Sequence, residues 1–181
     1  LVVGVSPMVE LVGLVQMLQP QQAPFVLPSN YQQAAKKQFK PWKNHRAVQL
    51  MQQLSSLRSD YATLPGMLAV ACRYASEDGW QLHTDLLPAK TDTQGLRDLV
   101  VALNDFAQAS GFAPWFEAEK NQLDAWAKTF EAAVQQQGYW SLGRALLADD
   151  QRSVHVWLTP LNAWGAYNVS CEVNKINASQ V

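Results

Sequence analysis

A short alternating segment near the end of the chain constrains the fold more than any other feature. Val154, Val156 and Leu158 fall on one face of an extended chain, since successive residues of a strand point to opposite sides. This alternation predicts a strand near 153–159 that is buried on at least one face. Pro160 ends the strand, because proline has no N–H to donate to a neighbouring strand.

A second strand candidate, the apolar segment Leu1–Val5, lies at the opposite end of the chain. Ser6 and Pro7 then predict a helix start, with serine as the N-cap and proline in the first helical position. Most of the sequence between the two strand candidates has helical patterning. We therefore predict a helix-dominated α+β fold of about six helices, with a small sheet from the N-terminal strand and the strand near 153–159.

Six segments have the spacing of apolar residues that an α-helix requires. They run from Pro7 to about Leu18, from Ser29 or Asn30 to before Pro41, from an Asn44 cap through Leu57, from near Thr63 through Ala75, over about Thr93–Ser110, and from Pro114 to Gln137. The segment Gly79–Thr91 has no regular pattern and is predicted to be irregular, with His83 on the surface.

The same spacing predicts which side chains face the core. They are Tyr31, Ala34, Ala35 and Phe39; Val48, Met51, Leu54 and Leu57; Met67, Leu68, Ala71, Cys72 and Ala75; Leu96, Leu99, Val100, Leu103 and Phe106; and Trp115, Phe116, Leu123, Trp126, Phe130 and Val134.

The first predicted helix is apolar on nearly every side, which indicates a helix buried between layers. Glu10 is its only charged residue. Our interpretation is that Glu10 interacts with the helix dipole or lies on the surface, and a functional acid is the remaining alternative.

Composition indicates one globular domain of 181 residues, with 48% hydrophobic and only 16% charged residues. The formal net charge of −1 argues against nucleic acid or an anionic membrane as a partner. Lys36, Lys37, Lys40, Lys43 and Arg46 form the only basic run. We interpret this run as a solvated face, with a binding patch as the alternative. No segment is long and apolar enough to span a membrane.

Metal and catalytic motifs are absent from the sequence. Cys72 and Cys171 are too few for a zinc site and are interpreted as buried thiols, with one disulfide as the alternative. His45, His83 and His155 are far apart along the chain. There is no His-Glu-x-x-His helix, phosphate-binding glycine loop or Gly-x-Ser-x-Gly turn. The residues themselves therefore predict no catalytic residue, no metal ligand and no cofactor.

Four segments, taken in order, resemble one bacterial family. They are VGVSPMVELVGLVQML at Val3–Leu18, KQFKPWKNHRAV at Lys37–Val48, LNDFAQASGFAPWFEAEK at Leu103–Lys120 and VHVWLTPLNAWGAYN at Val154–Asn168. The set resembles the bacterial family catalogued as domain of unknown function 4932, and it covers nearly the whole chain.

The resemblance implies a zinc-dependent peptidase of the extracytoplasmic space, periplasmic or secreted. In that family the zinc-binding His-Glu-x-x-His helix follows the last of these motifs, and no residue of this chain matches it. We therefore expect zinc only if the motif follows in a longer protein. The chain begins Leu-Val-Val and ends in a polar tail, so we expect it to be the N-terminal part of such a protein, not catalytic on its own.

By its place in the chain, LTPLNAWGAYN corresponds to the strand and loop that line the cleft in zinc peptidases. Gly165 would admit a close backbone, and Asn162, Tyr167 and Asn168 would orient a bound peptide or protein substrate. The alternative for this segment is a plain turn. For the whole chain, the alternative is a non-catalytic helical interaction module of the bacterial envelope. The oligomeric state is not predicted.

Overall fold

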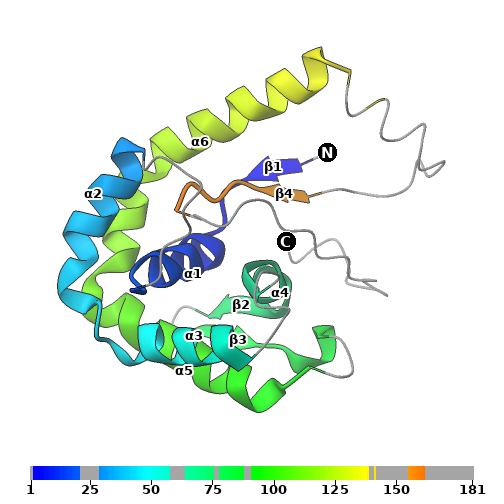
Figure 1. Cartoon of the computed structure of the whole chain (residues 1–181). Coiled ribbons are helices and arrows are strands. Elements are labelled where there is room, and N and C mark those ends of the chain that lie inside the picture. Colours follow the sequence, from blue (N-terminus) through cyan, green and yellow to red (C-terminus); the bar gives the residue numbers. More distant parts are fainter. Residues whose placement is uncertain are drawn as a thin grey trace.

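The computed structural model describes residues 2–20, 29–57, 64–75, 78–87, 91–138, 141 and 155–161. Its elements are β1 (Val2–Gly4), α1 (Pro7–Met17), α2 (Asn30–Phe39), η1 (Lys40–Trp42), α3 (Arg46–Leu57), α4 (Leu64–Ala71), β2 (Cys72–Ala75), β3 (Gly79–Leu82), η3 (Thr84–Leu86), α5 (Thr93–Ser110), α6 (Phe112–Gln136) and β4 (His155–Trp157). The predicted helix-dominated α+β fold is confirmed (Figure 1).

The two ends of the described chain pair as predicted, because β1 and β4 form a two-stranded parallel sheet. The register places Val3 opposite Val156 and Gly4 opposite Trp157, and the Leu158 N–H donates to the Gly4 carbonyl at 2.9 Å. The indole of Trp157 packs closely on Gly4, where an added Cβ would lie 3.2 Å from Trp157 Cζ3. Two parallel strands need a long connection, and here the helices provide it.

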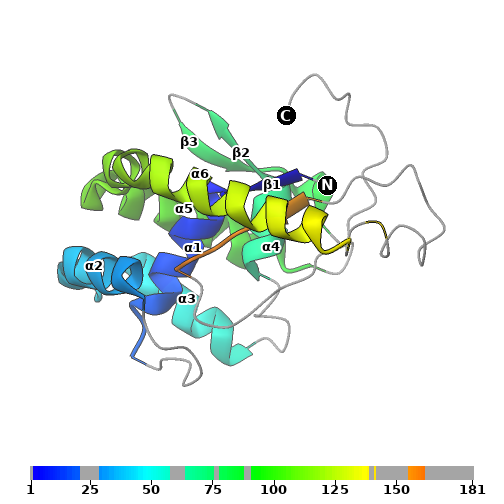
Figure 2. The same ribbon diagram turned by 90° about the horizontal axis from the view of Figure 1, so that it is seen from above.

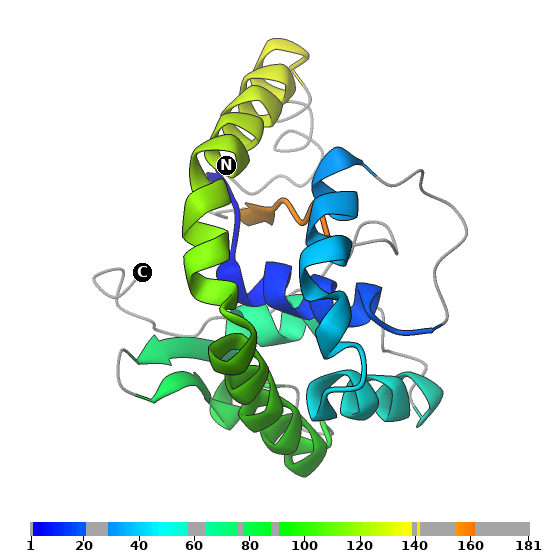
Figure 3. The same ribbon diagram turned by 90° about the vertical axis from the view of Figure 1, so that its left-hand side faces the viewer.

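Helix α1 lies at the centre of the molecule and contacts α2, α3, α4 and α5 (Figures 1 and 3). Ser6 caps it by accepting from the Val9 N–H, and Pro7 occupies the first turn. Met8 to Gln16 are all buried, and the apolar residues among them are buried as predicted. The helix therefore forms the middle of a single core.

Helix α2 begins with a capping box in which Ser29 and Gln32 each accept from the other's backbone N–H. The predicted inward residues are buried except Ala34, which is exposed. The prediction of Asn44 as the cap of α3 is wrong. The ring of His45 has this role instead, because its Nδ1 accepts from the Ala47 N–H at 3.2 Å.

The fourth predicted helix is too long, and the predicted irregular segment after it contains a strand. Helix α4 ends at Ala71, and Cys72 and Ala75 belong to strand β2. An antiparallel hairpin of β2 and β3 follows, with Cys72 opposite Leu82. The apolar run through Ala75 fits either a helical stripe or a buried strand, and tertiary contacts decide between them. His83, after β3, is exposed as predicted.

The side chain of Asn104 in α5 forms two hydrogen bonds with the backbone of the hairpin. Asn104 Oδ1 accepts from the Trp80 N–H and Asn104 Nδ2 donates to the Trp80 carbonyl, both at 2.8 Å. Gly79, at the start of β3, has a φ of 73° and lies so close to Asn104 that a Cβ there would be 2.6 Å from Asn104 Oδ1. Only glycine fits this position without strain.

Helices α5 and α6 meet at Gly111, whose φ of 70° ends α5 and starts α6. Helix α5 has the predicted bounds, whereas α6 begins two residues before the predicted Pro114. Phe130, predicted to face the core, is 41% exposed. Figure 2 shows α6 crossing over β1, and in Figure 1 the last turns of α6 extend past the other helices. No helix of the described residues is long and apolar enough to cross a membrane.

Candidate functional site

Glu10, the only charged side chain of α1, is the centre of a buried polar site. Glu10 is 0% exposed, so the surface position, which we expected as the alternative to a helix-dipole role, is wrong. Its place follows from the helix itself: a helix that buries every face must also bury the one acid it carries. A carboxyl group in such a place needs hydrogen-bond donors, because an unpaired buried polar group costs free energy.

Two donors from distant parts of the chain meet the Glu10 carboxyl group. The Tyr31 hydroxyl, from α2, donates to Oε2 at 3.1 Å. The backbone N–H of Leu161, four residues after the end of β4, donates to Oε1 at 3.4 Å. Glu10 therefore connects the central helix both to α2 and to the chain that leaves the parallel sheet.

Gln32 adds a second tie to the same segment. Its Nε2 donates to the Pro160 carbonyl at 2.7 Å. Tyr31 and Gln32 are consecutive in α2. This one turn of the helix therefore binds Glu10 through Tyr31 and the Pro160 carbonyl through Gln32. We call Glu10, Tyr31, Gln32, Pro160 and Leu161 the acid junction.

Two tryptophans of α6 fix the ring of Tyr31. Trp115 stacks on it with ring centroids 5.4 Å apart, and Trp126 meets it edge to face at 5.6 Å. Such pairs stabilise beyond the area they bury, and they restrict the direction in which the Tyr31 hydroxyl can point. The acid junction thus joins α1, α2, α6 and the segment after β4.

Burial dominates the electrostatics of the acid junction. Burial raises the pKa of Glu10 to about 8, although the hydrogen bonds from Leu161 and Tyr31 act in the opposite direction. The pKa of Tyr31 is also raised, first by burial and then by the nearby Glu10 carboxylate. At neutral pH Glu10 is therefore mainly protonated. A fully buried acid cannot reach a substrate, so the junction is suited to holding chain segments together.

The four predicted substrate-binding residues, Asn162, Gly165, Tyr167 and Asn168, lie outside the described residues. The described chain stops at Leu161, directly before Asn162. Sequence reasoning did not identify the acid junction. The available signal was Glu10 itself, the single charge of an otherwise apolar helix.

The histidines and cysteines of the described chain form no metal site. Over the described ranges, no group of three or more His, Cys, Asp or Glu side chains could hold a metal ion. His45 Nε2 lies 3.3 Å from Asp105 Oδ2 while its Nδ1 accepts from Ala47, so both ring nitrogens are engaged. Cys72 is a free, buried thiol, and burial raises its pKa to about 12. Cys171 lies outside the described residues.

Comparison with known proteins gives no relative: no family model, curated protein or solved structure matches this chain.

Proposed function

We propose that this chain is the N-terminal, substrate-side part of an extracytoplasmic zinc-peptidase-like protein, and that it binds an extended peptide without cleaving it. The binding surface in this proposal begins directly after the acid junction, at Asn162, and includes Gly165, Tyr167 and Asn168. Any zinc would come from residues beyond this chain.

The observation that supports the proposal is the attachment of the chain that leaves β4. Glu10 holds the Leu161 N–H and Gln32 holds the Pro160 carbonyl, so the residue before Asn162 has a fixed position on the core. A peptide-binding segment benefits from such a fixed start, because less conformational freedom is lost when the ligand binds. The resemblance to the peptidase family supplies the class of ligand.

Photo-cross-linking tests the peptide-binding surface. Tyr167→p-benzoylphenylalanine places a photoreactive group inside the proposed surface, and the variant is irradiated with a labelled, unstructured peptide. We expect the peptide to become attached without being cleaved. Tyr74→p-benzoylphenylalanine is the matched control, because Tyr74 is 64% exposed but lies on the hairpin. Equal labelling of the two variants, or none at Tyr167, contradicts the proposal.

A second candidate is the non-catalytic helical interaction module. Two exposed apolar side chains favour it, Tyr74 on β2 and Val101 on α5, which are 64% and 63% exposed. Preferential peptide labelling through Tyr74 would support this candidate instead. The parent gene also separates the two, since a His-Glu-x-x-His motif shortly after Val181 is expected only for the peptidase-like protein.

A further inference from the structure

The near-zero net charge of the chain hides an uneven distribution of charges. Residues 11–59 contain six of the 14 basic residues and none of the 15 acidic residues. This region includes α2, η1 and α3. The rest of the chain is correspondingly acidic, so the net charge says little about this face of the molecule.

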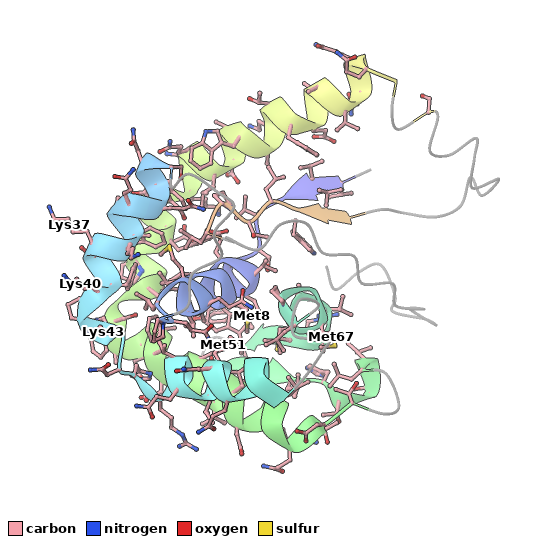
Figure 4. The ribbon with its side chains drawn as sticks, in the orientation of Figure 1. Met8, Lys37, Lys40, Lys43, Met51 and Met67 are labelled. Atoms are coloured by element: carbon pink, nitrogen blue, oxygen red, sulfur yellow. The ribbon has the colours of Figure 1, made fainter. Side chains whose placement is uncertain are left out.

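Five cations of this region lie on one stretch of the surface, which we call the basic surface. It consists of Lys36, Lys37, Lys40, Lys43 and Arg46, all of which are exposed. None of the five makes an ion pair with a carboxylate in the described part of the chain. Figure 4 shows Lys37, Lys40 and Lys43 pointing outward, away from Met8 and Met51 in the core.

The other residues exposed on this stretch are neutral. They are Gln33, Ala34, Gln38, Pro41, Asn44 and Gln49. The carboxylate of Asp105 in α5 lies next to this stretch, and its partner there is His45, 3.3 Å away. The repulsion among the five cations is therefore not relieved by a partner on the described chain, as it would be on an ordinary mixed surface.

The kind of cation and the shape of the surface distinguish between anionic partners. Four of the five are lysines, which act as point charges, whereas a site for one particular carboxylate or phosphate typically uses the planar fork of arginine. Helix α2 forms an outer edge of the molecule (Figures 1 and 4). An outer helix edge fits a broad, flat array of anions better than it fits a single extended peptide.

Binding through the basic surface does not involve insertion of apolar side chains into the partner. Trp42 is only partly exposed, and its ring packs edge to face on Phe106 at 6.4 Å and on His45 at 5.9 Å. Binding through this surface must therefore be electrostatic, with a strong dependence on salt.

We propose that the basic surface adsorbs this protein to a bilayer of anionic lipids, through Lys36, Lys37, Lys40, Lys43 and Arg46 and without insertion of a helix. Each basic residue close to such a bilayer strengthens binding severalfold, and five together are sufficient for stable adsorption at low salt. This proposal is independent of the peptide-binding surface after β4.

Sedimentation with lipid vesicles tests the proposal. We expect the intact chain to bind vesicles of phosphatidylcholine mixed with phosphatidylglycerol, but not vesicles of phosphatidylcholine alone. Raising the salt from about 0.1 M to about 0.5 M should weaken binding at least about tenfold. The double variant Lys37→Gln/Lys40→Gln should weaken it about tenfold or more.

The matched control is Lys120→Gln/Lys128→Gln, which removes two exposed lysines from α6 and gives the same net charge. It should bind like the wild type. An equal loss in both double variants, or no preference of the wild type for phosphatidylglycerol, overturns the proposal. So does binding to poly-glutamate without binding to vesicles, because the partner would then be an acidic polypeptide.

Discussion

The two small sheets are both held by a side chain from a helix, but the two side chains differ in chemistry. Asn104 of α5 pairs with the backbone of Trp80 in β3, 24 positions away. Glu10 of α1 pairs with the backbone of Leu161, which follows β4 and is 151 positions away. A two-stranded sheet is marginal by itself, so each sheet depends on its helix.

Because one attachment uses an amide and the other a carboxyl group, the two respond differently to pH. The amide of Asn104 does not titrate, so the attachment of the hairpin is the same at any moderate pH. The carboxyl group of Glu10 does titrate, and its pKa of about 8 lies in the physiological range. The parallel sheet and the start of the proposed peptide-binding surface therefore depend on pH, whereas the hairpin does not.

The largest effect is expected when the acid junction loses Tyr31. Tyr31→Ala removes a ring packed on Trp115 and Trp126 together with the donor to Glu10. We expect a loss of about 3–5 kcal/mol in the free energy of unfolding, as for other buried aromatic residues. Urea unfolding measures it. Tyr31→Phe keeps the ring and should lose only about 1 kcal/mol. A similar loss in both variants would show that the ring packing is unimportant.

The next effect concerns Glu10 and has a defined direction with pH. Between the unfolded pKa of 4.5 and the folded pKa of about 8, the folded state holds one more proton than the unfolded state. The contribution of Glu10 to stability is therefore fully present below 4.5 and is lost as the pH rises towards 8.

Glu10→Gln removes this loss, because the amide is neutral at every pH and can accept from Leu161 while donating to the Tyr31 oxygen. Relative to the wild type, the variant should gain a few kcal/mol between about pH 5 and about pH 9. Urea unfolding at both pH values checks this. Parallel pH profiles for the two proteins would refute it.

A smaller effect is expected at the hairpin. Asn104→Ala removes both hydrogen bonds to Trp80 and should cost about 2 kcal/mol. The loss should be the same at about pH 5 and about pH 9, in contrast to the behaviour of Glu10. Asn104→Asp is the informative companion, since it keeps one acceptor but loses the donor. A pH-dependent loss for Asn104→Ala would contradict the distinction between the two attachments.

The smallest effect belongs to Gly79. Gly79→Ala introduces a Cβ at a φ of 73° and forces Asn104 to move, at a cost of about 1–2 kcal/mol. The two substitutions at the hairpin should be non-additive, because Gly79→Ala already weakens the contact that Asn104→Ala removes. Additive losses in the double variant would mean that the strain at Gly79 is purely local.

The parallel sheet could be predicted from sequence although its strands are far apart, while the local hairpin could not. Val154, Val156 and Leu158 alternate clearly, and a strand at each end of a helical chain has few other partners. The first strand of the hairpin lies in the apolar run through Ala75, which also fits a helix. Asp78-Gly79, a pair typical of hairpins, does stand where β3 begins, but neither strand alternates clearly.

The acid junction could be anticipated only as a lone charge in an apolar helix. Its partners Tyr31 and Leu161 are brought to Glu10 by tertiary packing, and no local pattern encodes that meeting. The basic run was visible in the sequence, but only the fold shows that its five cations form no ion pair within the described residues. Sequence patterns thus predicted most of the helices and the parallel sheet, and the structure was needed for the hairpin and for the polar contacts between elements.

An NMR titration of the Glu10 side-chain carboxyl carbon tests the acid junction most directly. We expect a midpoint near pH 8, with the amide signal of Leu161 changing at the same midpoint and the amide signal of Trp80 unaffected. A midpoint near 4.5, or a Leu161 amide that does not follow Glu10, would contradict the account of a buried acid that holds the end of the parallel sheet.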